Sequence, residues 1–344
     1  TEPYNLARQL ASLDHISHGR AGWNVVTSSN ETEAWNFGRD KHYDHVDRYR
    51  RAHEFVEVTK GLSDTWEDDA FLRDKANSRF FDPAKLHLLN HVGENFSVRG
   101  PLNVARPPQG YPVIVQAGSS DRGRQLAAET AEVIFTAQND IEEGRAFYSD
   151  VKGRMAPFGR RPSELKIMPG FFPVVGRTRE EAQAKYDALQ ALLPESAGLN
   201  LLSTLLGGFD LTGYPLDGPL PPIPESNSGK SRPELLVAMA KRDNLTIRQL
   251  YGRMATARGH IMAVGTPADI ADAMEEWVTT GAADGFNIMP GYMPVAIEEF
   301  VDLVVPELQK RGLYRTEDEG TTLRESLGLA RPVNQYAKDK AAAE

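Results

Sequence analysis

Apolar residues recur with helical spacing near the start of the chain. Leucine and isoleucine at positions 6, 10, 13 and 16 are four, three and three residues apart, which predicts a helix over residues 3–19. A second helix is predicted over residues 42–62, with the arginines at positions 48, 50 and 51 reaching solvent at its edges. The short β-branched run at 22–27 predicts a buried strand, and the polar stretch 28–41 predicts a loop.

Further apolar runs alternate with helical patterns along the rest of the chain. Strands are predicted at 112–116, 133–136, 165–175 and 284–289. Helices are predicted at 122–131, 141–158, 179–193, 233–242, 247–257, 268–280 and 295–311. Alternating helices and continuously apolar strands are typical of a parallel sheet covered by helices, so the sequence predicts an α/β fold.

The predicted strands number five, whereas a closed (β/α)8 barrel needs eight. The chain opens at Thr1, without methionine, and almost at once in a helical pattern that should follow a strand. We therefore expect a TIM barrel that lacks its first three strands in this chain.

Two segments break the alternation. Residues 64–110 show no sustained period, apart from short strands predicted at 86–89 and 95–98. Residues 194–233 hold seven prolines and six glycines, so no long regular element is expected there. We expect one barrel domain over residues 1–329, with insertions at about 64–110 and 194–233, and a tail at 330–344.

Composition narrows the classes of function. The chain has 344 residues, a net charge of −9 and no cysteine, which excludes a thiolate nucleophile, disulfides and an iron–sulfur cluster. The negative charge argues against nucleic acid as a partner. No apolar run approaches the roughly 18 residues of a membrane span and no signal peptide opens the chain, so we expect a cytoplasmic protein without membrane association.

The segment Gln116-Ala-Gly-Ser-Ser-Asp121 lies between a predicted strand and a predicted helix. Small residues at Gly118, Ser119 and Ser120 would let a phosphate approach the helix N-terminus, where free N–H groups and hydroxyls could bind it. The alternative is an ordinary helix N-cap. Neither a dinucleotide fingerprint nor a P-loop is present.

Several histidines are further candidates. His45 and Tyr49 are four residues apart on one helical face and could both donate to a phosphate, or could form a simple surface pair. His260 precedes an apolar run and could act as a proton donor or cap the preceding helix. His87 and His91 are also four residues apart, but no histidine pattern matches a known metal motif, so we expect no metal.

Seven motifs, taken in order along nearly the whole chain, carry a family resemblance. They are Pro3-Tyr-Asn-Leu-Ala-Arg8, Leu13-Asp-His-Ile-Ser-His-Gly-Arg-Ala-Gly-Trp-Asn-Val-Val-Thr-Ser28, Tyr49 in Asp-Arg-Tyr, Gln116-Ala-Gly-Ser-Ser120, Gly265-Thr-Pro, Asp284-Gly-Phe-Asn and Thr322-Leu-Arg-Glu-Ser-Leu-Gly-Leu329. Together they resemble the nitrilotriacetate monooxygenase branch of the bacterial-luciferase-like flavin monooxygenases.

This resemblance implies a TIM barrel that uses FMN as FMNH2, delivered by a separate NAD(P)H-dependent flavin reductase, with O2 as cosubstrate. One oxygen atom would enter a small organic substrate through a flavin C4a-hydroperoxide, and the protein would supply orientation and a dry cavity. The flavin contacts of the family would fall on Asn24 and Thr27, on His45 and Tyr49, and on Ser119 or Ser120 at the phosphate. The 194–233 stretch would then form part of a lid or of the substrate mouth.

Alternatives remain open at this point. The substrate could be an aminopolycarboxylate, a sulfone, an alkane or a heterocycle. The chain could instead be an oxidoreductase of the same fold that uses F420, or an inactive truncated remnant that serves as a structural or partner protein. Because an open sheet exposes its strand edges, we also expect the chain to form a homo-oligomer.

Overall fold

The computed structural model describes residues 1–28, 31–224 and 231–337. The chain folds into two compact units. The first comprises Thr1–Ile134, Arg154–Lys166 and the segment from Glu317 onward, and the second comprises Phe135–Gly153 and Ile167–Thr316.

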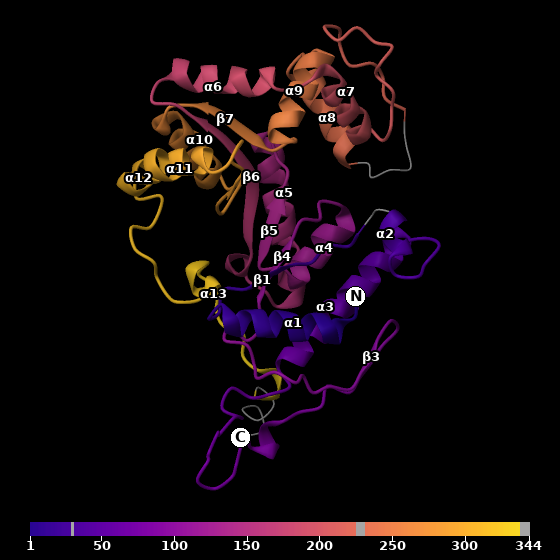
Figure 1. The fold of residues 1–344 in the computed structure, drawn as a ribbon, viewed down its shortest axis with the longest axis vertical. Helices are drawn as coiled ribbons and strands as arrows, with labels where there is room; N and C mark the ends of the chain where they lie inside the picture. Colours follow the sequence, from indigo (N-terminus) through magenta and orange to yellow (C-terminus); the bar gives the residue numbers. More distant parts are fainter. Residues whose placement is uncertain (29–30, 225–230, 338–344) are drawn as a thin grey trace. The chain divides into compact units, whose positions relative to one another are not determined.

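Parallel strands form the centre of the first unit (Figure 1). β1 (Gly22–Asn24) pairs with β4 (Val113–Gln116), and β4 pairs with the start of β5 (Val133–Thr136). The predicted strands at 112–116 and 133–136 are thus confirmed, and the strand predicted at 22–27 is shorter, ending at Asn24.

Helices α1 (Pro3–Ile16), α3 (His45–Ser63) and α4 (Asp121–Thr130) confirm three predicted helices of the first unit. The apolar face of α3 is buried in two directions. Phe55 and Leu62 pack in a core that includes Ala7 and Ala11 of α1, whereas Val56 packs with Ile114 of β4. This double contact fixes α3 beside the carboxyl ends of β1 and β4.

The irregular stretch 64–110 contains η1 (Pro83–Lys85) and a hairpin of β2 (His91–Val92) and β3 (Ser97–Val98). The strand predicted at 95–98 is found at 97–98, whereas residues 86–89 form no strand. The Glu54 carboxylate holds this hairpin by accepting hydrogen bonds from the His91 ring and the Asn95 and Phe96 backbone N–H groups.

The late motif 322–329 has a structural role in the first unit. It contains α13 (Leu323–Ser326), and the Arg324 side chain is only 1% exposed. Its guanidinium forms an ion pair with Glu132 and donates to the Tyr111 carbonyl at 3.1 Å. The side chain of Asn334, in the expected tail, is also buried, and it donates to the Asp64 and Trp66 carbonyls; residues 338–344 lie outside the described residues.

The second unit has parallel strands of its own, in which β6 (Lys166–Val175) pairs with β7 (Ile261–Gly265) and β8 (Asn287–Ile288). Phe171 pairs with both Ile261 and Ile288, so β6 lies between the other two. The predicted number of five parallel strands was wrong, because the described residues contain six. β7 escaped prediction because its apolar run comes soon after α9 (Ile247–Ala257), and such a run does not distinguish a strand from a helix.

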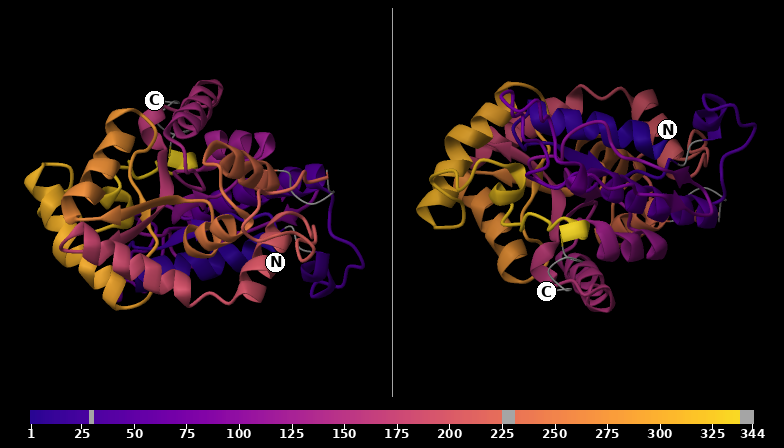
Figure 2. Two further views of the ribbon diagram at one scale, coloured as in Figure 1. Left: turned by 90° about the horizontal axis from the view of Figure 1, so that it is seen from above. Right: turned by 90° about the horizontal axis from the view of Figure 1, so that it is seen from below.

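Figure 2 shows, from above and from below, the helices that accompany these strands in the second unit. They are α5 (Ile141–Gly153), α6 (Arg179–Ala191), α9 (Ile247–Ala257), α10 (Pro267–Thr279), α11 (Val295–Glu299) and α12 (Val305–Lys310), with the π-helical turn Phe300–Val304 joining the last two. The predicted helix at 247–257 is confirmed at both ends.

The expectation of no long regular element in 194–233 was wrong. α7 (Glu195–Leu205) runs for 11 residues and packs with α8 (Ser231–Arg242) and α9 around the buried Leu202, Leu236 and Leu250. The prolines do not prevent this, because Pro194 precedes the helix and the next proline is Pro215. In the described part of the chain, no helix has the length and apolar content to cross a bilayer.

Candidate functional site

The loop between β4 and α4 forms a narrow cradle of small residues. The Ser120 side chain is the N-cap of α4 and accepts from the Gly123 N–H at 3.2 Å, which confirms the predicted capping role. Gly118 and Gly123 approach each other so closely that a Cβ on Gly118 would lie 3.0 Å from the Gly123 Cα. Any side chain at Gly118 would therefore push the loop away from the helix.

Two side chains of α3 complete this cradle. The Tyr49 hydroxyl lies 3.4 Å from the Ser120 Oγ. A Cβ on Gly118 would lie 3.2 Å from the same Tyr49 hydroxyl. The His45 and Tyr49 rings lie 4.9 Å apart. The structure thus brings His45, Tyr49, Gly118 and Ser120 together, with the exposed Ser119 between the last two.

The chemistry of this cradle suits a phosphate. The first turn of α4 offers N–H groups and a partial positive charge, and hydroxyls of serine and tyrosine stand beside it. These four residues therefore fit the phosphate of a flavin mononucleotide.

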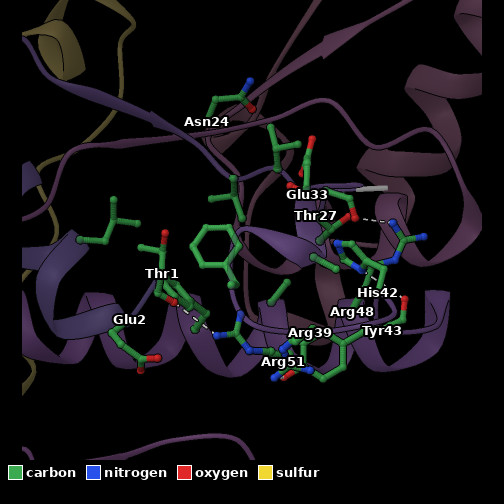
Figure 3. A pocket seen from close by; sticks show the side chains of 18 of the residues that line it. Thr1, Glu2, Asn24, Thr27, Glu33, Arg39, His42, Tyr43, Arg48 and Arg51 are labelled. Atoms are coloured by element: carbon green, nitrogen blue, oxygen red, sulfur yellow. Dashed lines mark hydrogen bonds between the residues drawn. The ribbon is translucent and has the colours of Figure 1, made fainter. Parts of the chain in front are cut away.

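Asn24 and Thr27 lie at a second place, at the carboxyl end of β1. Both line a pocket of about 480 Å³ in the first unit (Figure 3). Trp23 and Phe55 give this pocket an apolar wall, and their rings lie 5.9 Å apart. The arrangement can hold a flat aromatic group against polar side chains.

The same pocket contains basic and aromatic side chains that were not predicted to line a binding site. Arg39, Arg48, Arg51, His42 and Tyr43 all line it. We had expected Arg48 and Arg51 to reach solvent at the edges of α3, but both side chains are partly buried against the pocket. Only Arg50 behaves as expected, since it forms exposed ion pairs with Asp47 and Glu94. The spacing of Arg51 and Phe55, four residues apart, was the available signal.

His260 lies in the second unit, immediately before β7. Its side chain is 7% exposed, and its ring stacks on Phe135 of β5 with centroids 5.0 Å apart and an interplanar angle of 17°. Gly170 of β6 makes room for it, because a Cβ there would lie 2.4 Å from the His260 Nδ1. The C-cap of α9 is Arg258, so His260 lies two residues beyond the helix end.

His87 and His91 each form a hydrogen bond with a different glutamate. The His87 ring bonds Glu67 at 2.8 Å, and the His91 ring bonds Glu54 at 3.0 Å. Although burial alone would raise the pKa of Glu54, hydrogen bonds from His91, Asn95 and Phe96 lower it to about 2. Within the described ranges, no group of three or more potential metal ligands gathers.

Comparison with known proteins decides the family. The model of the luciferase-like monooxygenase family matches residues 1–284. The chain belongs to the luciferase-like monooxygenases.

Two relatives are very similar. The chain is 60% identical over 340 residues to N-acetyl-S-(2-succino)cysteine monooxygenase of Bacillus subtilis (strain 168), covering 98% of this chain and 77% of the relative. It is 58% identical over 338 residues to nitrilotriacetate monooxygenase component A of Aminobacter aminovorans, covering 98% and 75%. The crystal structure of a riboflavin lyase with modified FMN and riboflavin matches with a TM-score of 0.81 and 34% identity, covering 97% and 73%.

This luciferase-like monooxygenase therefore has the α/β barrel fold of its family, as the sequence predicted, and it is an enzyme. Its relatives support a flavin cofactor and a flavin reductase partner.

Proposed function

We propose that this chain is the oxygenase component of a two-component monooxygenase that uses FMNH2 and O2. The observation that carries the proposal is the cradle of Gly118, Ser120 and Tyr49, where two hydroxyls and the N-terminus of α4 offer hydrogen-bond donors to the FMN phosphate. Bound FMNH2 supplies the electrons that activate O2, so that the substrate gains one oxygen atom while FMNH2 becomes FMN and the second oxygen atom leaves as water.

The residues of the chain would bind and orient the flavin. Ser119, Ser120 and Tyr49 would donate to its phosphate, with His45 beside them. Asn24 and Thr27, at the end of β1, would hold polar atoms of the flavin in the pocket that they line, against its aromatic wall. FMNH2 would arrive from a separate NAD(P)H-dependent flavin reductase, as the name "component A" of one relative suggests.

In the second unit, we propose His260 as a candidate acid. Its burial and its stacking on Phe135 fix the ring, and an imidazole is the side chain whose charge changes most readily near neutral pH.

For the substrate, we propose an organic polycarboxylate. Both relatives at 58–60% identity are named for such compounds, nitrilotriacetate and N-acetyl-S-(2-succino)cysteine.

The experiment combines the chain with a flavin reductase, NADH, FMN and nitrilotriacetate, and measures O2 consumption and product. Parallel reactions replace FMNH2 with F420H2. The proposal predicts FMN-dependent product formation and none with F420H2. Product formed with F420H2 alone, or FMN binding that is unchanged when Ser119, Ser120 and Tyr49 lose their hydroxyls, would refute it.

A further inference from the structure

Three arginines approach the pocket that Asn24 and Thr27 line. Arg39 comes from the loop after α2 (Glu31–Trp35), whereas Arg48 and Arg51 come from successive turns of α3. Figure 3 shows the three side chains on the same side of the pocket, next to Tyr43 and His42. The loop between α2 and α3 thus adds a third positive charge to the two on the helix.

None of these guanidinium groups has a carboxylate partner within 4.0 Å among the described residues. Arg48 donates to the Ser28 carbonyl, and its Nε is buried without a hydrogen-bond partner in the described structure. Arg51 donates to the Thr1 carbonyl at 3.3 Å, and Arg39 donates to the Tyr43 hydroxyl. Arg50 of the same helix differs, because Asp47 and Glu94 neutralise it.

Aromatic rings fix the planes of two of these groups. The Arg39 guanidinium lies 3.8 Å from the Tyr43 ring centroid. The Arg51 guanidinium lies 4.7 Å from the Phe96 centroid and 5.8 Å from those of Tyr43 and Phe55. A guanidinium that rests on a ring keeps its further N–H groups available to a planar, bidentate acceptor such as a carboxylate.

The acidic side chains that line the pocket are fewer than its arginines. The acidic lining residues are Glu2 and Glu33, both exposed, against three arginines. Figure 3 shows Glu2 apart from Arg39 and Arg48. This local excess contrasts with the net charge of −9 of the whole chain. A pocket of this sign would attract an organic anion.

We propose that Arg39, Arg48 and Arg51 form a carboxylate-binding subsite that determines substrate specificity. The subsite takes at least two carboxylates of one small molecule, because Arg39 comes from the loop before α3 whereas Arg48 and Arg51 come from successive turns of that helix. This inference rests on the proposed function, since it places the substrate in the pocket where Asn24 and Thr27 would hold the flavin.

The test uses the full chain loaded with FMN. The probes are nitrilotriacetate, iminodiacetate and sarcosine, which carry three, two and one carboxylate. Affinity is measured by calorimetry at low and high salt for the wild type and for Arg39→Gln, Arg48→Gln and Arg51→Gln. Arg50→Gln is the matched control, because it removes the same charge from the same helix outside the pocket. Unfolding midpoints identify any variant that merely fails to fold, and Arg39→Gln serves this purpose best because Arg39 is exposed.

We expect the affinity of the wild type to rise from sarcosine to nitrilotriacetate and to fall with salt. Each pocket variant should weaken nitrilotriacetate binding by about 10- to 100-fold, as expected for loss of a hydrogen bond to a charged group, while Arg50→Gln changes it less than about twofold. In turnover, the loss should appear in KM rather than in kcat.

Two results would overturn the inference. One is affinity that does not depend on the number of carboxylates or on the three arginines. The other is variants that weaken binding of FMN but not of riboflavin and leave carboxylate affinity unchanged, because the arginines would then hold the flavin phosphate. The proposed function fails separately, if the wild type neither binds FMN nor oxygenates any substrate.

Discussion

Ser119 and Ser120 allow the helix-capping role of the cradle to be separated from its phosphate-binding role. Ser120→Ala removes the N-cap of α4, whose side chain accepts from the Gly123 N–H at 3.2 Å, and it also removes a donor to the phosphate. Ser119→Ala removes only an exposed hydroxyl. Loss of an N-cap costs about 1 kcal/mol of stability, and loss of a hydrogen bond to a charged phosphate costs about 1.5–3 kcal/mol of binding.

The two variants should therefore differ in stability and agree in flavin affinity. Urea unfolding without flavin should show about 1 kcal/mol lost in Ser120→Ala and no loss in Ser119→Ala. Titration of FMN by fluorescence should show about 10- to 100-fold weaker binding in both, and riboflavin binding should be unchanged in Ser119→Ala.

Thr178→Ala provides a matched control. Thr178 is the N-cap of α6 and accepts from the Glu181 N–H at 3.2 Å, the same distance as at Ser120. It should lower stability as Ser120→Ala does and leave FMN affinity unchanged. Suppose that Ser120→Ala lowers stability but leaves FMN affinity unchanged, and that Ser119→Ala changes neither. The cradle is then an ordinary helix cap, and the phosphate assignment is refuted.

Three further predictions follow from packing and charge. Gly118→Ala places a Cβ 3.0 Å from the Gly123 backbone, so thermal unfolding should show a loss of about 1–3 kcal/mol together with weaker FMN binding; an unchanged midpoint would contradict the close approach. Arg324→Ala leaves Glu132 buried without its ion-pair partner, so urea unfolding should show a loss of about 3–5 kcal/mol in the free energy of unfolding. A loss under about 1 kcal/mol would contradict the importance of the pair. Because the pKa of Glu54 is lowered to about 2, its stabilising effect is complete above pH 4.5 and is lost as the pH falls toward 2; Glu54→Gln should flatten the pH dependence of stability across that range, and an unchanged dependence would contradict it.

Much of the fold could be predicted from the sequence because hydrophobic periodicity is a local property. The helix at 247–257 and the strand at 133–136 have strong, uninterrupted patterns, and both were predicted with the bounds that the structure has. β7 and α7 were missed for opposite reasons. The apolar run of β7 comes soon after a helix and does not distinguish a strand from a helix, whereas α7 lies in a segment whose overall proline content hides a proline-free stretch.

The candidate site could be predicted only where its residues are close to one another in the sequence. Gln116 to Asp121 shows its small residues in one run, and His45 and Tyr49 share a helical face. The gathering of Arg39 with Arg51 was not predictable, because it depends on how the loop after α2 returns to α3. The aromatic stacking of Arg51 likewise depends on Phe96, which is 45 residues away (96 − 51 = 45) in an irregular segment.

Isotope transfer tests the central claim most directly. The chain, supplied with FMNH2 by a flavin reductase, would react with ¹⁸O2 in the presence of nitrilotriacetate, and the product would be analysed by mass spectrometry. We predict that one ¹⁸O atom enters the oxidised organic product for each FMNH2 consumed productively. Oxidised product that contains oxygen only from water, or FMNH2 oxidation that yields hydrogen peroxide and no oxygenated product with any polycarboxylate, would contradict the account.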